Sequence, residues 1–284
     1  LPTTAGAYVT YKGSPLSEGK LQFDLWNEDQ KYMEDKIEAY LANFRERVLI
    51  PSFKQIDGMN KLQNIKRHYY DPSKSPYDWN TLRAKLAKFG ARNSLLLSLM
   101  PTAGTSQILG LNECFEPYTE NIYVRKTMAG EFEVVNPHLQ IALSEMGLWN
   151  DSVAKNIRIN QGSVAGLVGV DDHFKARFAT AYEISQKVII DHAVVRSPFI
   201  CQTQSMNLFM KNPTIAKVSA MHFYGWSRGL KTGMYYLRGL AAAKPFEFNF
   251  TREEIERFKL SGSNPNPSPT TVKSEDEICL ACSG

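Results

Sequence analysis

Two cysteines close to the end of the sequence have the spacing of a redox pair. Cys279 and Cys282 form a C-x-x-C motif, whereas the remaining cysteines, Cys114 and Cys201, stand alone. No second C-x-x-C or paired histidine completes a four-ligand zinc site, so a redox dithiol is the better interpretation. The motif follows residues 261–278, SGSNPNPSPTTVKSEDEI, which are too polar to fold. Such a flexible tether spans about 21 to 25 Å on average, so the pair can shuttle between an interior site and an outside reductant.

A second candidate is the segment LLLSLMPTAGTSQILG, residues 95–110, in which an apolar run leads through a proline into small and hydroxyl side chains. Where a strand ends and a helix begins, unpaired backbone N–H groups and the positive end of the helix dipole converge on one spot. A phosphate can approach that spot if the side chains are small, as they are at Thr102, Ala103, Gly104, Thr105 and Ser106. An ordinary capped helix has the same pattern, so both interpretations stay open from the residues alone.

The third candidate is a pair of adjacent tyrosines, Tyr235 and Tyr236, within HFYGWSRGLKTGMYYLR. Neighbouring residues of a strand normally point to opposite faces, which favours one core ring and one surface ring. A redox role would need both phenols in a buried line. Each could then lose an electron together with a proton, because the neutral phenol has a pKa near 10.

The elements expected to position these residues alternate between helices and strands. Apolar residues at helical spacing predict an amphipathic helix over 31–47, and residues 49–76 read as an irregular excursion. Capping and periodicity then predict helices over 78–88, 137–148, 172–195 and 213–230, and strands over 93–100, 203–210 and 231–238. Strands separated by helices of this length indicate a parallel α/β arrangement.

The composition is that of a globular protein and argues against several classes of partner. Of the 284 residues 43% are hydrophobic, and the net charge is +4 with basic residues scattered along the chain. We therefore expect no nucleic-acid and no membrane partner. No apolar stretch approaches the length of a membrane span, and the start lacks a signal-peptide pattern, which predicts a cytoplasmic protein. Because the sequence begins with Leu1, we expect it to be processed, split or incomplete at its front.

Taken together, these segments resemble the large subunit of class I ribonucleotide reductases, especially the eukaryotic and viral type. The resemblance covers roughly residues 7–28 and 77–284 and is carried by YDWNTLRAKLAKFGARNSLLLSLMPTAGTSQILG, EPYTENIY, GEFEVVNPHL, MHFYGWSRGLKTGMYYLR and CLACSG. It implies an α/β fold in which this chain supplies the later part of a ten-stranded α/β barrel. Residues 1–260 would belong to the barrel domain, with an unmatched insertion over 29–76, and residues 261–284 would form the flexible C-terminal tail.

The resemblance also implies a role for each candidate. The loop Thr102, Ala103, Gly104, Thr105 and Ser106 would bind the phosphates of a ribonucleoside diphosphate. Tyr235 and Tyr236 would relay a radical from the small subunit, which holds the metal-radical cofactor, while this chain binds no cofactor or metal of its own. Cys279 and Cys282 would reduce an active-site disulfide and be reduced in turn by thioredoxin or glutaredoxin.

Three positions depart from the family pattern or invite misreading. Gly104 stands where the family more often has Ser, and Cys201 stands where Asp is expected, so Cys201 reads as a small buried apolar residue. Cys114 lies in N-x-C-x-E, the spacing of the family's radical cysteine, but it follows the phosphate loop whereas the radical motif lies far upstream of it. The radical cysteine would therefore lie in sequence absent here.

The sequence thus predicts a C-terminal large-subunit segment that acts in deoxyribonucleotide synthesis once joined to an N-terminal segment. Two alternatives remain open. One is a non-catalytic remnant that only binds the small subunit, and the other is an independent dithiol carrier that uses its tail.

Overall fold

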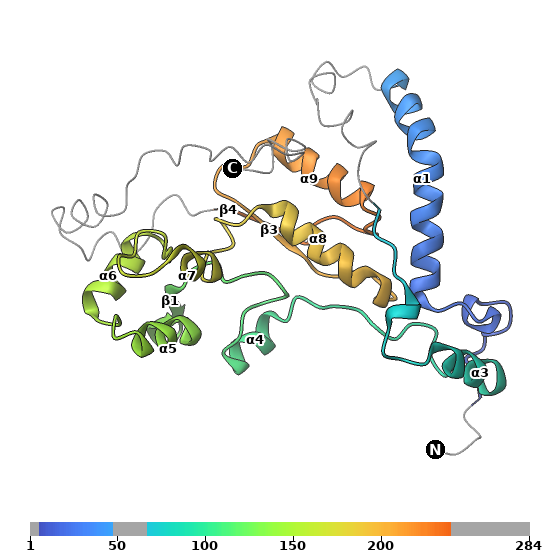
Figure 1. Ribbon diagram of the computed structural model, residues 1–284, viewed down its shortest axis with the longest axis horizontal. Coiled ribbons are helices and arrows are strands. Elements are labelled where there is room, and N and C mark those ends of the chain that lie inside the picture. Colours follow the sequence, from blue (N-terminus) through green and yellow to red (C-terminus); the bar gives the residue numbers. More distant parts are fainter. Residues whose placement is uncertain (1–5, 48–66, 240–284) are drawn as a thin grey trace.

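The computed structural model describes residues 6–47 and 67–239, and Figure 1 shows how their helices and strands are arranged. Three short 3-10 helices, at Pro15–Glu18, Pro72–Lys74 and Ser197–Phe199, join the longer elements. The α-helices are α1 (Gln22–Arg47), α3 (Trp79–Phe89), α4 (Ala103–Leu109), α5 (Pro137–Glu145), α6 (Asp151–Ile159), α7 (Asp172–Arg177), α8 (Gln186–Arg196) and α9 (Ile215–Ser227). The strands are β1 (Ile122–Thr127), β2 (Gly130–Val135), β3 (Asn207–Met210) and β4 (Tyr236–Gly239).

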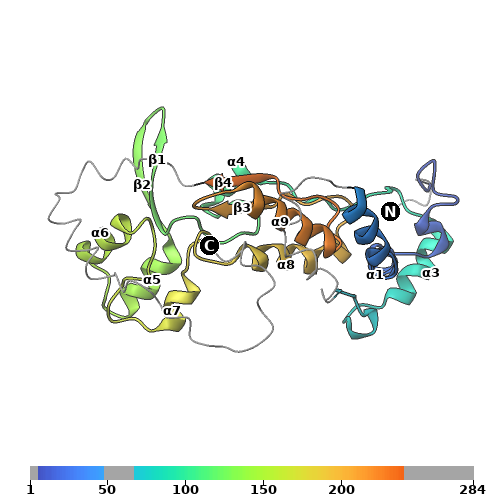
Figure 2. The same cartoon turned by 90° about the horizontal axis from the view of Figure 1, so that it is seen from above.

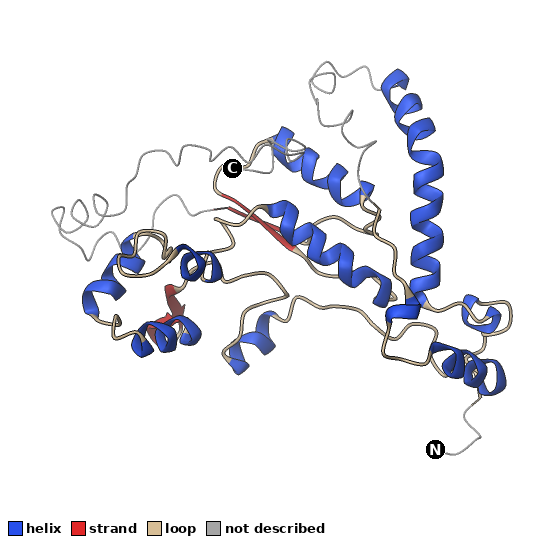
Figure 3. Ribbon diagram, in the orientation of Figure 1, coloured by secondary structure: helices blue, strands red, loops and turns tan. Residues whose placement is uncertain are grey.

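The strands of the described residues form two separate sheets. β3 and β4 pair in parallel, with Asn207 opposite Tyr236 and Met210 opposite Gly239, and helix α9 connects them. Figure 3 shows this pair beside α8 and α9. The helix-separated parallel pair agrees with the predicted α/β class, but the described residues form no closed barrel.

The second sheet is an antiparallel hairpin that the sequence analysis did not predict. β1 and β2 pair from Ile122 opposite Val135 to Thr127 opposite Gly130. The hairpin projects away from α5, α6 and α7 (Figure 2). Its turn carries Met128 and Ala129 and lacks the Asn-Gly or Asp-Gly pair that is typical of two-residue turns, so the sequence contains no strong hairpin signal.

Local capping residues bound two of the predicted helices, α3 and α5. The Asp78 side chain accepts a hydrogen bond from the Thr81 N–H at 3.0 Å and opens α3, which ends at Gly90 with a φ of 70°. Asn136 caps α5 in the same way, with Pro137 at the first helical position. The predicted helix over 31–47 is the later part of α1, which begins nine residues earlier at Gln22.

Two predicted elements differ from the structure. The helix expected over 172–195 is broken, because residues 178–185 turn between α7 and α8 and the Glu183 carboxylate accepts hydrogen bonds from the Thr180 N–H and hydroxyl, both at 2.8 Å. The buried strand expected over 93–100 is largely exposed and makes only one isolated parallel bridge, between Leu99 and Gln204. Among the described residues only the chain leading into β3 lies along it, so its other leucines remain uncovered.

Two hydrophobic clusters hold the described residues together. The larger joins α8, α9, β3 and the start of α1, where Trp26 is buried beside Ile190, Leu208 and Met221. The smaller lies among α5, α6 and the base of the hairpin and consists of Ile122, Leu139, Leu143, Ala154, Ile157, Val164, Leu167 and Phe178. Within the described part of the chain, no helix is long and apolar enough to cross a membrane.

Candidate functional site

A cavity of about 570 Å³ brings two of the predicted sites together. One wall is the predicted phosphate loop, and the other is the tyrosine pair with its neighbours. The lining residues are Met100, Pro101, Thr102, Ala103, Gly104, Thr105, Glu113, Asn207, Tyr235, Tyr236 and Arg238. Segments more than one hundred residues apart in the sequence therefore share one hollow.

The loop wall is shaped by an unusual residue conformation. Thr102 precedes α4 with a φ of 57°, in the left-handed region that is uncommon for a residue with a side chain. Its hydroxyl bonds locally to the Pro101 carbonyl at 2.7 Å, and it does not cap the helix. The first N–H groups of any helix lack intrahelical partners, so those of α4 at Ala103, Gly104 and Thr105 are available to an anion in this cavity.

Gly104, in the first turn of α4, has open space where a side chain would lie. A Cβ atom built on it meets no heavy atom within 4 Å, and its backbone has an ordinary helical conformation. Gly104 in place of the family's more common Ser thus removes a hydroxyl from a position that has space for one.

Ser106, the last residue of the predicted loop, does not face this cavity. It is buried, its hydroxyl bonds to the Ala103 carbonyl at 3.3 Å, and it lines a neighbouring cavity of about 430 Å³. Glu113, Asn207 and Arg238 line both cavities. The structure therefore places four of the five predicted loop residues together and Ser106 behind them.

The two tyrosine rings are in contact and do not occupy opposite faces. Their centroids lie 4.3 Å apart with an interplanar angle of 64°, an edge-to-face arrangement. Strand β4 begins only at Tyr236, so Tyr235 escapes the strict alternation of a strand. Each residue is 50% exposed in the described chain, so the buried line that a redox pair was expected to need is absent from this part of the structure.

Hydrogen bonding within the tyrosine pair favours the neutral form of Tyr235, and the guanidinium of Arg238 lies close to the pair. The hydrogen bond between the two tyrosine side chains, together with the proximity of the Tyr236 phenol, raises the pKa of Tyr235. The Arg238 guanidinium carbon lies 4.8 Å from the centre of the Tyr236 ring. The same guanidinium contacts the Glu113 carboxylate at 3.4 Å.

Cys114 lies just behind the loop, and its surroundings favour the neutral thiol. Burial, followed by the nearby charge of Glu116, raises the pKa of the Cys114 thiol to about 12. Its Sγ donates to the Pro101 carbonyl at 3.4 Å and accepts from the Asn207 amide at 3.5 Å. Cys114 lines neither of the two cavities described above.

Glu116, which is the Glu of the N-x-C-x-E spacing, and Arg238 received no role in the site from the sequence. Burial raises the pKa of the Glu116 carboxyl, whereas a hydrogen bond from the Asn207 N–H acts in the opposite direction. Both residues lie within motifs that carry the resemblance, EPYTENIY and MYYLR, but the sequence gives no signal that they meet near one cavity.

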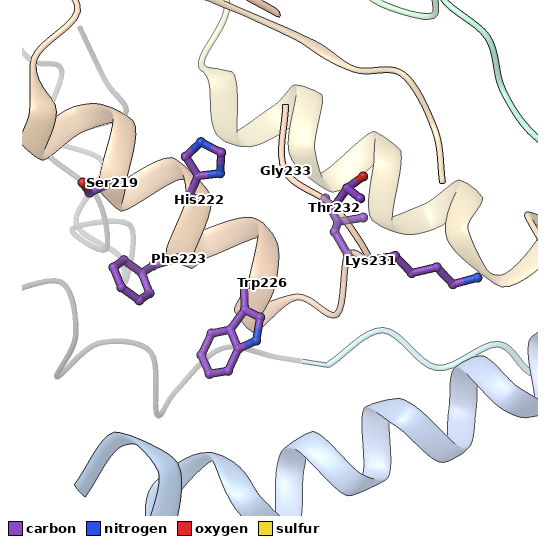
Figure 4. A pocket seen from close by; sticks show the side chains of 8 residues that line it. Ser219, His222, Phe223, Trp226, Lys231, Thr232 and Gly233 are labelled. Atoms are coloured by element: carbon purple, nitrogen blue, oxygen red, sulfur yellow. The ribbon is translucent and has the colours of Figure 1, made fainter. Parts of the chain in front are cut away.

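A further cavity of about 420 Å³ lies on α9, and none of its lining residues belongs to a predicted site. Figure 4 shows its side chains, which come from α9 and from the connection toward β4: Ser219, His222, Phe223, Trp226, Lys231, Thr232 and Gly233. The aromatic run HFYGW marks this helix in the sequence.

Of the other cysteines considered in the sequence, only Cys201 lies among the described residues. Cys201 is partly buried, and its Sγ accepts a hydrogen bond from the Leu96 N–H at 3.4 Å, which suits a small packing residue. Cys279 and Cys282, with their tether, lie outside the described residues.

The comparisons with known proteins agree on one family. A family model described as the ribonucleotide reductase barrel domain matches residues 1–236. The ribonucleoside-diphosphate reductase large chain of Cryptosporidium parvum is 39% identical over 297 residues, covering 98% of this chain and 32% of that relative. The large subunit from Acanthamoeba polyphaga mimivirus is 42% identical over 254 residues, covering 89% of this chain and 24% of that relative.

A solved structure, the class Id ribonucleotide reductase alpha subunit of Actinobacillus ureae, is 33% identical with a TM-score of 0.49, over 55% of this chain and 28% of that one. The present chain spans about a third or less of the length of the curated relatives it matches. The match covers most of the chain and runs through both the loop and the tyrosine pair. The chain therefore belongs to the ribonucleotide reductase large-subunit family and carries part of its barrel domain.

Proposed function

We propose that this chain is the C-terminal segment of a ribonucleotide reductase large subunit that acts in the radical-based reduction of ribonucleoside diphosphates to deoxyribonucleoside diphosphates. The observation that carries the proposal is the shared cavity, in which an anion-accepting loop faces two tyrosines in ring contact. Substrate binding and radical delivery must meet at one place, and this cavity offers both.

The loop is suited to the diphosphate of the substrate. The N–H groups of Ala103, Gly104 and Thr105 begin α4, where the helix dipole also favours an anion. Arg238, on the opposite wall, presents a guanidinium to the same cavity, where it also contacts the Glu113 carboxylate at 3.4 Å. The resemblance assigns this loop the same role.

The tyrosines are suited to carry the radical. Each phenol must lose an electron and a proton together, and a hydrogen bond between the two hydroxyls gives the proton a direct route. Relay through Tyr235 and Tyr236 would then connect the metal-radical cofactor of the small subunit with a cysteine on the N-terminal segment. Cys114 does not serve as that cysteine, since it lies behind the loop and bonds to Pro101.

Two further partners follow from the same proposal. An N-terminal large-subunit segment supplies the radical cysteine and completes the barrel against the exposed leucines of residues 95–97. Thioredoxin or glutaredoxin reduces the tail pair, Cys279 and Cys282, after each turnover.

Reconstitution tests this proposal. The chain alone should form no deoxynucleotide, whereas the chain combined with an N-terminal large-subunit segment, a small subunit and a dithiol should convert a ribonucleoside diphosphate. Omitting any one protein should abolish product. Deoxynucleotide formation by the isolated chain would refute the segment assignment, and inactivity of the complete mixture would favour a non-catalytic remnant.

A further inference from the structure

The edge of β3 that faces away from β4 carries backbone donors in need of partners. The Met206 carbonyl accepts from the Tyr235 N–H at 2.6 Å, so alternation along the strand directs the N–H groups of Asn207 and Phe209 to the opposite edge. One step earlier on that edge, the Ser205 N–H donates to the Leu99 carbonyl at 2.9 Å. The chain after Leu99 then turns away into the phosphate loop and leaves the next donors without a neighbouring strand.

Two side chains replace the missing strand. Glu116 Oε1 accepts from the Asn207 N–H at 2.9 Å, and Gln186 Oε1 accepts from the Phe209 N–H at 2.7 Å. Both residues are buried, with exposures of 7% and 3%. A buried N–H group requires a partner, so each side chain fixes its part of β3.

Of these two side chains, only Glu116 is also connected to the phosphate loop through hydrogen bonds. The backbone N–H of Cys114 donates to the Thr102 hydroxyl at 3.1 Å and to the Pro101 carbonyl at 3.2 Å. Asn207, which Glu116 holds, returns a hydrogen bond from its amide to the Cys114 Sγ at 3.5 Å. Gln186, by contrast, donates to the carbonyls of Ala181 and Ile184, away from the loop.

Two residues of this hydrogen-bonded arrangement have a backbone conformation that their surroundings must hold. Thr102 and Cys114 both adopt positive φ, 57° and 52°, which residues with side chains rarely do unless their surroundings hold them there. Asn112 strengthens the arrangement by donating to the Glu116 carbonyl oxygen at 2.6 Å. The loop, the segment 112–116 and the start of β3 therefore form one hydrogen-bonded unit.

The far end of this unit is the tyrosine pair, since Asn207 lies directly opposite Tyr236 in the β3–β4 register. We propose that Glu116 is a positioning residue that couples occupancy of the phosphate loop to the placement of Tyr235 and Tyr236. The route runs from Thr102 through Cys114 and Asn207 to β4. This inference rests on the proposed function of the loop and adds a link between substrate binding and the radical relay.

Hydrogen exchange on the full chain tests the link, with pyrophosphate as the probe. The N–H groups of Asn207 and Tyr235 donate to Glu116 and to the Met206 carbonyl, so neither is free to bind the probe. Because both residues also line the cavity, direct shielding by the probe is separated from a relayed effect by variants at Glu116 and Cys114 that leave the loop residues unchanged. Saturating pyrophosphate should slow the exchange of both amides by about tenfold. Calorimetry on the same samples establishes that pyrophosphate is bound.

Four variants separate coupling from simple stability. Glu116→Gln keeps the acceptor oxygen and should retain the protection, whereas Glu116→Leu should lose it while pyrophosphate still binds. Cys114→Ala removes the hydrogen bonds of the thiol, to Asn207 among others, but leaves the backbone hydrogen bonds of residue 114 in place, and it should reduce the protection at Tyr235 at least threefold. Gln186→Leu is the matched control, because it removes the equivalent cap at Phe209 but should leave the protection at Tyr235 unchanged.

The outcomes are decisive in both directions. Equal protection of Tyr235 in the unsubstituted chain, Glu116→Leu and Cys114→Ala would overturn the coupling, as would bound pyrophosphate that protects neither amide. Failure of pyrophosphate to bind the unsubstituted chain would overturn the phosphate-loop assignment itself, and the coupling with it.

Discussion

The lobe built from α5, α6, α7 and the base of the hairpin differs sharply from the edge that carries the loop and the tyrosines. Leu139, Leu143 and Ile157 in the lobe are at most 1% exposed, so its core is closed by its own residues. Along the other edge, large apolar side chains face outward: Leu95, Leu96, Leu97, Met100, Ile108, Leu109, Leu111, Tyr235 and Tyr236. Large apolar side chains left exposed in this number indicate an interaction surface. The groups proposed for chemistry thus lie where the packing of this chain is incomplete.

The largest expected effect concerns the tail, which neither region contains. Replacing Cys279 and Cys282 by Ser should stop turnover driven by thioredoxin in the assembled enzyme but preserve turnover with a small dithiol, which diffuses to the interior disulfide directly. Deoxynucleotide formation with each reductant is the measurement. Equal loss with both reductants would mean that the tail serves another purpose.

A charge in the loop should have the next largest effect. Gly104→Asp places a carboxylate beside the substrate phosphates in a position with room for it, and the repulsion should raise KM for the diphosphate about 100-fold or more. Gly104→Asn has the same shape without the charge and is the matched control. If KM is the same for the Asp and Asn variants, the loop has been assigned to the wrong ligand.

Truncating one leucine in each region tests the comparison itself. Leu143→Ala should lower the free energy of unfolding by about 2 to 5 kcal/mol, because it opens a cavity in a closed core. Leu96→Ala, at a side chain in a residue that is 71% exposed, should change it by less than about 0.5 kcal/mol. Denaturant unfolding of both variants measures the difference, and similar losses would show that the edge is already covered in the free chain.

The smallest effect is expected at Cys114. Cys114→Ser should leave turnover within about twofold, since a hydroxyl can make the same two hydrogen bonds. The folded chain raises the thiol pKa to about 12, so the thiol contributes stability below its unfolded pKa and loses it as the pH rises from about 8.5 toward 12. The stability of the parent relative to the Ser variant should therefore fall over that range. A well-folded but inactive Ser variant would restore Cys114 as the radical site.

The elements that the sequence predicts well are those with local signals. Asp78 and Gly90 bound α3, and Asn136 with Pro137 opens α5, because capping depends on residues within one turn. The break between α7 and α8 depends instead on Glu183 reaching back to Thr180. The apolar residues keep their helical spacing through the break, so the sequence pattern does not indicate it.

The site was predictable in its parts but not in its assembly. The motifs identify the loop and the tyrosines, whereas their meeting in one cavity depends on the crossover that α9 makes between β3 and β4. Glu116 acquires its role only because the chain diverges after Leu99 and leaves the Asn207 N–H uncovered. The spacing of residues along the sequence cannot show that a backbone N–H group will find no partner on a distant segment.

The central claim is that the loop and the tyrosine pair serve one reaction from one cavity, and Tyr236→Phe tests it most directly. Phe keeps the ring contact with Tyr235 and nearly the same volume but has no phenolic proton to lose. In the assembled enzyme this variant should form no deoxynucleotide while its affinity for the ribonucleoside diphosphate stays within about twofold of the parent. Normal product formation by a Tyr236→Phe enzyme would contradict the account.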